Sequence, residues 1–343
     1  MEGKRIRALV VGANGEMGRA CVRYMTERGV DLVAAVGRRT NLGEDIGALA
    51  GIGENGILLE GSADLAAIVE RSKPDAAIFC TAPLSVIAPD IKTCVERGVN
   101  VITIAEEAYY PAVFEPKLQA QLDALARESG ASIVGLGMQD VNWSNECVVM
   151  SANCITLNSI YGENWCILDH VGPMEIEGIG IGLTEVEFHD LHKDDPTPRS
   201  HFTPTLYQIA DELGLTVTEE VNAKCAPLLA TNDYESWTGV IPKGRVIGST
   251  LSTELKTEEG ISLVGRFCYS FAQDGAAGVN IWRFDGEPSF EIVTDDPRPD
   301  MTTTIDAVTR IPDVINARPG FLTVKDLPKP FYRSKPLPEY LHD

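Results

Sequence analysis

The sequence contains no run of about 18 consecutive apolar residues, the length that a membrane-spanning helix requires. It is also poor in basic residues, with 29 Lys and Arg against 50 Asp and Glu and a net charge of −21 at pH 7. This charge argues against nucleic acids and anionic membranes as partners, although local groups can still hold a phosphate-bearing cofactor. Because residues 1–5 lead straight into an apolar strand, we expect no signal peptide and a cytoplasmic protein.

Histidine is scarce as well: the chain has five, beside eight cysteines that form no CxxC pair and no regular spacing. Several cysteines lie inside apolar runs, Cys80 and Cys268 among them. We therefore expect buried, reduced thiols and no metal site. His189 and His192 suggest a metal as one interpretation. Because prolines follow closely, a polar loop over residues 189–196 is the favoured one.

The chain has an ordinary globular composition, 44% apolar and 23% charged over 343 residues, which is typical of roughly two domains. Up to residue 140, short apolar strands alternate with amphipathic helices. This alternation predicts an α/β domain at residues 1–140 with a Rossmann-type, doubly wound parallel sheet. The strands are expected at residues 8–11, 31–36, 76–80, 99–105 and 131–134.

Beyond residue 140 the strands become longer and alternate in polarity, as at residues 262–270, 278–283 and 290–293. A helix is expected among them at about residues 204–213. The pattern predicts a second, α+β domain at residues 141–297 with a mostly antiparallel sheet. A helix at about residues 302–317 and a Pro-rich end complete the chain.

One stretch organises the N-terminal domain: the strand at residues 8–11 ends at Gly12, and Gly15 and Gly18 lead into a helix. Glycine at these positions permits a tight turn, close approach of the backbone to a pyrophosphate, and close packing of helix on strand. The N–H groups and the positive end of the helix then face the phosphates. We predict a dinucleotide site here, and the alternative is a plain βα turn. The expected cofactor-binding residues of the loop are Gly12, Asn14, Gly15, Glu16 and Met17.

The second strand ends in Gly37-Arg38-Arg39-Thr40, some 20 residues past the glycine loop. NAD-binding folds usually place an acid there, which holds the ribose 2′-hydroxyl. Two arginines stand there instead, and they suit the 2′-phosphate of NADP. We therefore predict NADP as the cofactor, with NAD as the second candidate. The alternative for Arg38 and Arg39 is a solvated basic loop.

Two further strand ends carry candidate residues, because ligands of an open α/β sheet bind beyond the carboxyl ends of its strands. Thr81, Ala82 and Pro83 are expected beside the cofactor. Glu106 and Glu107 directly follow a buried strand. Like charges this close favour a proton on one of them, which suits a general base or acid near neutrality. The alternative is a pair of helix N-terminal acids that the helix dipole favours.

The strand at residues 131–134 leads into the segment that joins the two domains. There we predict Gln139, Asn142 and Trp143 as substrate-pocket residues, with Trp143 as an apolar wall or, alternatively, an interdomain core residue. Tyr161 and Trp165 are further candidate walls, although aromatic residues of this kind usually pack in a core.

Several motifs resemble known families. Residues 11–19 are similar to the opening of dihydrodipicolinate reductases. Residues 106–111, Glu-Glu-Ala-Tyr-Tyr-Pro, resemble the Glu-Glu-x-x-Tyr-Pro signature of 2,4-diaminopentanoate dehydrogenases and the related native amine dehydrogenases. Residues 311–321 and 326–328 resemble the C-terminal segment of that family. The first motif is widely shared, and the other two are more specific.

The resemblance implies NAD(P)H-dependent reductive amination of a carbonyl compound with ammonia, and the reverse oxidative deamination. It places the catalytic acid on Glu106 or Glu107, with Glu107 preferred. It also implies that residues 298–343 return to the nucleotide domain, with Thr303 near the cleft. The second domain would then bind substrate and form a homodimer through its sheet. No metal is implied, because an iminium ion carries its own positive charge.

Two differences from these families narrow the substrate. Diaminopentanoate dehydrogenases tend to carry Asn-Pro-Gly where this chain has Trp143, which resembles native amine dehydrogenases that act on simple ketones and aldehydes. The reductase signature Lys-x-Asp-x-Pro-Ser-Gly-Thr is matched only in part, by residues 192–196, which argues against dihydrodipicolinate. The prediction is therefore an amine dehydrogenase of a small aldehyde or ketone. The alternatives are an NADP-dependent reductase of another small substrate on the same scaffold and an NADP-sensing protein without turnover.

Overall fold

The computed structural model of the protein describes residues 4–170, 176, 178–194, 197–272, 278–295 and 298–342. Contacts divide the chain into two units. Unit 1 comprises Met1–Val141 and Pro299–Asp343, and unit 2 comprises Asn142–Arg298. Among the described residues, no helix is both long enough and apolar enough to cross a membrane.

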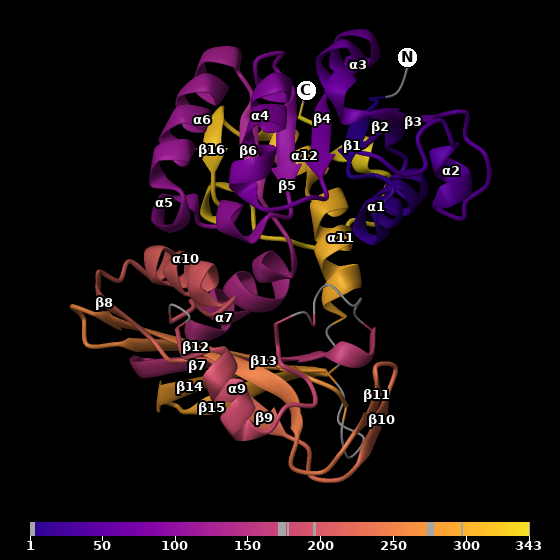
Figure 1. Ribbon diagram of the computed structural model, residues 1–343. Helices are drawn as coiled ribbons and strands as arrows, with labels where there is room; N and C mark the ends of the chain where they lie inside the picture. The colour runs from indigo at the N-terminus through magenta and orange to yellow at the C-terminus, as the bar shows by residue number, and fades with distance from the viewer. Residues whose placement is uncertain are drawn as a thin grey trace. The chain divides into compact units, whose positions relative to one another are not determined.

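Unit 1 is built on a seven-stranded sheet in the order β16-β6-β5-β4-β1-β2-β3, in which all neighbouring strands are parallel (Figure 1). The predicted Rossmann-type sheet is thereby confirmed. Its strands are β1 (Arg7–Val11), β2 (Asp31–Gly37), β3 (Leu59–Gly61), β4 (Ala76–Phe79), β5 (Asn100–Thr103), β6 (Ser132–Gly135) and β16 (Gly320–Leu322).

Helices cover both faces of this sheet. They are α1 (Glu16–Glu27), α2 (Ile46–Leu49), α3 (Leu65–Ser72), α4 (Leu84–Val95), α5 (Pro111–Phe114), α6 (Pro116–Ser129), α11 (Pro299–Thr309) and α12 (Ile311–Asn316). Short 3₁₀ turns are η1 (Ser62–Asp64), η2 (Glu106–Ala108), η6 (Val324–Asp326) and η7 (Leu337–Tyr340).

The double covering follows from the alternation of side chains along each strand. Ala8 and Val10 of β1 belong to one buried cluster, with apolar residues of α1, α11 and α12. Leu9 and Val11 belong to a second cluster, with residues of α3, α4 and α6. A strand that is buried on both faces requires a continuous run of apolar residues, and the sequence of β1 contains such a run.

The C-terminal segment of unit 1 differs in detail from the expectation. The single helix expected at about residues 302–317 is two helices, α11 and α12, separated at Arg310. Pro312 lies in the first turn of α12, where a proline is tolerated because its missing N–H has no intrahelical partner. The chain then adds β16 to the edge of the sheet beside β6.

Unit 2 contains a mixed sheet in the order β15-β14-β7-β13-β12-β8, with β9 paired to β12. Only the β7–β13 pair among these described strands is parallel, so the prediction of a mostly antiparallel sheet is confirmed. The strands of the unit are β7 (Thr156–Ile167), β8 (Val217–Asn222), β9 (Ala226–Leu229), β10 (Tyr234–Ser236), β11 (Gly239–Ile241), β12 (Val246–Thr257), β13 (Ser262–Ser270), β14 (Val279–Glu287) and β15 (Phe290–Asp295).

Among the described residues of unit 2, the helices are α7 (Glu146–Ser151), α9 (Glu185–Leu191) and α10 (Thr203–Leu213), beside the 3₁₀ turn η4 (Leu168–His170). The π-helical turn η3 (Gln139–Asn145) spans the division between the units. Phe202, just before α10, packs closely on the sheet. A Cβ added to Gly265 would lie 2.3 Å from the Cβ of Phe202, so only glycine fits there.

The segment expected to be a polar loop at residues 189–196 begins instead inside helix α9. A capping box starts this helix, because the Thr184 hydroxyl accepts from the Glu187 N–H while the Glu187 carboxylate accepts from the Thr184 N–H. His189 lies in α9 and His192 directly follows it. Asp195 and Pro196 lie outside the described residues.

Candidate functional site

The glycine loop lies between β1 and α1, where the strand order of the sheet reverses. β1 lies between β4 and β2, and such a switch point is where open α/β sheets bind their ligands. Gly12 has a φ of +83°, and its N–H donates to Val36 O at 2.8 Å. A Cβ on Gly18 would lie 2.2 Å from Gly12 O, so glycine alone permits this packing of α1 on the loop.

The start of α1 is open to an anion. Its N-cap residue is Gly15, which has no side chain to accept from the first N–H groups of the helix. Unpaired N–H groups and the positive end of the helix dipole therefore meet at Glu16 and Met17. These residues fit the pyrophosphate of a dinucleotide.

The two arginines after β2 are exposed. Arg38 acts electrostatically on Asp90 of α4, where burial raises the pKa of Asp90 and the nearby guanidinium opposes that rise. Arg39 has no hydrogen bond or ion pair with any residue that the structure describes. The amide of Asn14 donates to Thr40 O at 3.2 Å and to Thr40 Oγ1 at 2.7 Å, and so ties the arginine loop to the glycine loop.

Thr81, Ala82 and Pro83 follow β4, the strand next to β1. A Cβ on Gly12 would lie 2.7 Å from Thr81 Cγ2, so the loops after β1 and β4 are in contact. Pro83 is the N-cap residue of α4 and contributes no side-chain hydrogen bond to it. Directly before Thr81, the Cys80 Sγ lies 3.6 Å from the Sγ of Cys21, a contact between free thiols that the spacing of the cysteines did not indicate.

Glu106 and Glu107 form most of the 3₁₀ turn η2, beyond the carboxyl end of β5. β5 neighbours β4, so the two carboxylates lie at the same edge of the sheet as the loops after β4 and β1. Both side chains are half-buried. Glu107 Oε2 accepts from the Leu84 N–H at 3.3 Å, which joins Glu107 to the first turn of α4 and to Pro83. Glu107 thus serves as an acceptor at the start of α4, a partly structural role.

The next strand end, after β6, approaches the same turn. Gly135 packs against Ala108, because an added Cβ would lie only 2.3 Å from the Ala108 carbonyl. The Tyr109 hydroxyl donates to Gln139 O at 2.9 Å. The Met138 N–H donates to Thr303 Oγ1 of α11 at 3.2 Å, so the hydroxyl of Thr303 already has a structural role. Gln139 itself is half-buried.

In unit 2, Trp143 is 1% exposed and stacks on Phe202, with ring centroids 4.1 Å apart. Phe267 and Trp282 complete an aromatic cluster around Phe202. The backbone O of Asn142 accepts from the indole N–H of Trp282 at 3.2 Å. Trp143 is therefore a core residue of unit 2 as well as a predicted pocket residue.

The structure does not bring Tyr161 and Trp165 together with Trp143. A Cβ on Gly162 of β7 would lie 2.6 Å from the Trp282 ring, so Gly162 faces the aromatic cluster. Tyr161 and Trp165 are odd-numbered neighbours on the same strand and face the opposite side of the sheet. There both donate to Glu163, Trp165 Nε1 at 2.8 Å from Oε1. Burial and Glu163 raise the pKa of Tyr161 to about 12.

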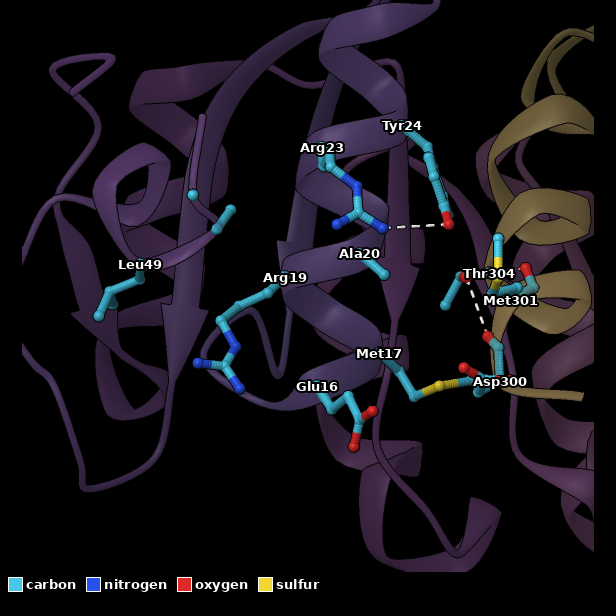
Figure 2. A pocket seen from close by; sticks show the side chains of 12 residues that line it. Glu16, Met17, Arg19, Ala20, Arg23, Tyr24, Leu49, Asp300, Met301 and Thr304 are labelled. Atoms are coloured by element: carbon cyan, nitrogen blue, oxygen red, sulfur yellow. Dashed lines mark hydrogen bonds between the residues drawn. The ribbon is translucent and has the colours of Figure 1, made fainter. Parts of the chain in front are cut away.

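Two cavities accompany these residues, one in each unit. A cavity of about 320 Å³ in unit 1 runs along α1 from Glu16 and Met17 to Tyr24, and α11 forms its other wall. Figure 2 shows Met17 and Asp300 on the two walls, with their side chains directed toward one another. A cavity of about 650 Å³ in unit 2 has His189, His192, Lys193 and Lys224 in its lining. Within the described residues, no group of three or more His, Cys, Asp or Glu is arranged to hold a metal.

Unit 1 contains a group of buried charges that was not predicted from the sequence. Asp140, Asp306, Arg310, Asp313 and Arg333 are all nearly inaccessible to solvent. Part of this group could have been found in the sequence, because residues 306, 310 and 313 recur at helical spacing with alternating charge. A fully buried Asn164 in β7 was missed too, and neither of its amide atoms has a hydrogen-bond partner among the described residues.

Two family models match the chain. The model described as "Dihydrodipicolinate reductase, N-terminus" matches residues 6–104. The model described as "2,4-diaminopentanoate dehydrogenase C-terminal domain" matches residues 145–336, more than half of the chain.

Three relatives are similar over nearly the whole length. The 2,4-diaminopentanoate dehydrogenase of Acetoanaerobium sticklandii is 28% identical over 95% of this chain and 94% of its own. The solved structure of an amine dehydrogenase from Mycobacterium smegmatis is 31% identical, has a TM-score of 0.86, and is matched over 96% of this chain and 98% of its own. A dipicolinate-bound dihydrodipicolinate reductase from Paenisporosarcina sp. TG-14 shares the fold. It is 14% identical, has a TM-score of 0.50, and is matched over 92% of this chain and 96% of its own.

Proposed function

Because this chain belongs to the 2,4-diaminopentanoate dehydrogenase family of oxidoreductases, whose scaffold is that of dihydrodipicolinate reductase, we propose that it is an NAD(P)H-dependent amine dehydrogenase. Its reaction is the reversible reductive amination of a small aldehyde or ketone with ammonia. The observation that carries this proposal is the Glu106–Glu107 turn, which lies at the same edge of the sheet as the glycine loop.

Membership of a Rossmann-type dehydrogenase family implies a nicotinamide cofactor. The pyrophosphate fits the glycine loop and the uncapped start of α1, and Thr81 to Pro83 adjoin the same loop. For the choice between cofactors we propose NADP, with Arg38 and Arg39 on the 2′-phosphate. When bound, the nicotinamide supplies the hydride for amination or accepts it in the reverse direction.

The carboxylates supply the proton transfers. One of the pair, with Glu107 favoured, accepts a proton from ammonium, and the free nitrogen lone pair then attacks the carbonyl carbon. The same group returns its proton to the hydroxyl of the carbinolamine, which leaves as water. The resulting iminium ion is the hydride acceptor, and exclusion of water protects it from hydrolysis. The hydrogen bond from Leu84 N fixes one oxygen of Glu107 and leaves the other for this chemistry.

For the substrate pocket we propose residues of the segment after β6 and of α11. Among the predicted pocket residues, Gln139 accepts a hydrogen bond through its backbone O from Tyr109, which directly follows the carboxylate turn. Asn142, Trp143 and Thr303 remain predicted pocket residues. Tyr161 and Trp165 are left out of the proposed pocket, since they face away from Trp143 on β7.

The test of this function is the consumption of NADPH and of NADH with short aldehydes and ketones, with and without ammonium. The proposal expects consumption to require ammonium. Consumption that is independent of ammonium would identify a carbonyl reductase instead. Tight NADPH binding without turnover on any tested carbonyl compound would favour a sensing protein.

The carboxylates are tested by Glu106→Gln and Glu107→Gln, singly and together. A general acid or base contributes about 10²–10⁴-fold to a rate, so we expect kcat to fall by that factor in the variant that removes the catalytic group. Glu96→Gln is the matched control, because Glu96 is partly exposed beside Lys92 in unit 1 and has no proposed role. Turnover that survives the double variant would remove the catalytic assignment.

We also propose a homodimer that forms through the sheet of unit 2. Val293 of β15 is 54% exposed, and its register with Ile281 and Glu163 places it on the face that carries Tyr161 and Trp165. Val293→Glu is expected to raise the dissociation constant of the dimer in sedimentation. Val149→Glu is the control, because Val149 is 55% exposed on α7 of the same unit. Equal effects of the two substitutions would argue against this face.

A further inference from the structure

Five charged side chains are buried together in unit 1, beyond the carboxyl end of β6. They come from the turn η3, from α11, from the residue between α11 and α12, from α12 and from the C-terminal tail, and each is at most 8% exposed: Asp140, Asp306, Arg310, Asp313 and Arg333. Arg310 Nε lies 2.9 Å from Asp140 Oδ2, and Arg310 Nη1 lies 2.5 Å from Asp313 Oδ2. Arg333 Nη2 lies 2.6 Å from Asp313 Oδ1.

The charges of this cluster do not balance unless one carboxyl is protonated. Three carboxyl groups meet two guanidinium groups, and an uncompensated buried charge is strongly unfavourable. Asp306 lies close enough to Asp140 for the charge of Asp140 to act on it, and Oδ1 of Asp306 is buried without a hydrogen-bond partner among the described residues. Ionised carboxylates only accept, so two such groups can be joined by a hydrogen bond only if one of them carries a proton.

Asp306 is the residue that holds this proton. Arg310 pairs with Asp140 and with Asp313, whereas Oδ1 of Asp306 is buried and has no hydrogen-bond partner among the described residues. A proton between the two carboxyl groups satisfies that oxygen. Burial, followed by the charge of Asp140, raises the pKa of Asp306 well above its usual range, and Arg310 opposes this rise only in part.

The same carboxyl group reaches the candidate site. Asp306 Oδ2 accepts from the Gly137 N–H at 3.1 Å, and Thr303, one turn earlier on α11, accepts from the Met138 N–H. On the other side, Tyr109 donates to the backbone of Gln139. Residues 137–139 are therefore fixed between α11 and the segment that carries the two glutamates.

We propose that Asp306 is a positioning residue, whose protonated carboxyl bonds to Asp140 with one oxygen and holds residues 137–139 with the other. It does not touch substrate or cofactor. Its part in catalysis rests on the proposed function, in which Gln139 contacts the substrate. The proton on Asp306 and its hold on the Gly137 amide are independent of that function.

Infrared spectroscopy of the full-length protein at neutral pH tests the proton directly. The difference spectrum between wild type and Asp306→Asn is expected to show the carbonyl stretch of a protonated carboxyl, present only in the wild type. Asp64→Asn is the matched control, because Asp64 is an exposed aspartate of the same unit with no side-chain cap bond. Loss of an ionised carboxylate band in Asp306→Asn would overturn the proposal.

Hydrogen exchange and kinetics test the positioning role. Asparagine can accept from Gly137 and donate to Asp140, so Asp306→Asn should retain the protection of the Gly137 and Met138 amides and the wild-type kcat. Asp306→Ala should raise the exchange rate of these amides about 10-fold or more and lower kcat with little change in cofactor KM. Unchanged protection in Asp306→Ala would refute the role.

If the alanine variant does not fold, the pH profile of Asp306→Asn decides the question. In the wild type, the folded state binds one proton that the unfolded state does not bind. Its folding equilibrium constant should therefore fall about tenfold for each unit that the pH rises, relative to the folding equilibrium constant of Asp306→Asn. Parallel profiles would overturn the proposal. Failure of ammonium-dependent turnover in every protein would count against the proposed function alone, because the infrared and exchange readouts need no reaction.

Discussion

Replacement of Gly135 by alanine is the sharpest perturbation of the carboxylate turn. Gly135 ends β6, and an added Cβ would lie 2.3 Å from the carbonyl atoms of Ala108 and 2.5 Å from Tyr109 N. Ordinary van der Waals contact begins at 3.4 Å, so η2 must move by about 1 Å to admit the methyl group. Overpacking of this kind costs about 1–3 kcal/mol in the free energy of unfolding.

The effect on catalysis is separate from the effect on stability, because kcat is measured on the folded protein. A displacement of about 1 Å at a catalytic group costs on the order of 100-fold in rate, and η2 carries both glutamates. The assay compares kcat for ammonium-dependent NAD(P)H consumption with the free energy of unfolding in urea. Gly61→Ala is the control, since its added Cβ would meet only Leu42 Cδ1, at 4.0 Å. A Gly135→Ala enzyme with the kcat of the wild type would refute the role of this turn.

Three further outcomes are expected. Arg38→Ala and Arg39→Ala should raise the KM for NADPH about 10-fold, by loss of a charge-assisted bond to the 2′-phosphate, and leave the KM for NADH nearly unchanged. Equal changes in the KM for NADPH and the KM for NADH would show that the two arginines do not bind the 2′-phosphate. Gly18→Ala should abolish dinucleotide binding in calorimetry, because its Cβ would lie 2.2 Å from Gly12 O; retained affinity would contradict the proposed cradle. The raised pKa of Asp306 means that the folded state binds a proton that the unfolded state has released above about pH 4. In urea unfolding, the stability of the wild type relative to that of Asp306→Asn should therefore fall as pH rises, by up to about 1.4 kcal/mol per pH unit until the folded pKa is passed; a difference that rises over this range would contradict the raised pKa.

The first sheet was predictable because its central strands are buried on both faces and therefore read as continuous apolar runs, as β1 does. The glycine loop and the glutamate pair could also be predicted, because each directly follows such an apolar strand. Strands β3 and β16 have only three residues each, too few to show a period. The resemblance to the 2,4-diaminopentanoate dehydrogenase family is confirmed by the family model over residues 145–336, which include residues 311–321; the motif at residues 106–111 lies outside both matched ranges.

Contacts between residues that are far apart in the chain could not be predicted from the sequence. Tyr161 and Trp143 both looked like pocket walls, but the face of β7 on which each lies depends on register and helix packing. The five buried charged residues around Asp306 are a second example of contacts that the sequence does not predict. Residues 306, 310 and 313 recur at helical spacing in the sequence, whereas Asp140 joins them only because the segment after β6 lies against α11 and Arg310 in the folded unit. A pair of buried acids in contact leaves no local pattern.

The source of the nitrogen in the product tests the central claim most directly. The protein is incubated with NADPH, a short ketone and ¹⁵N-labelled ammonium, and the product is identified by mass spectrometry. The account predicts an amine that carries the label in proportion to the NADPH consumed. An unlabelled alcohol formed at the same rate with or without ammonium would contradict it.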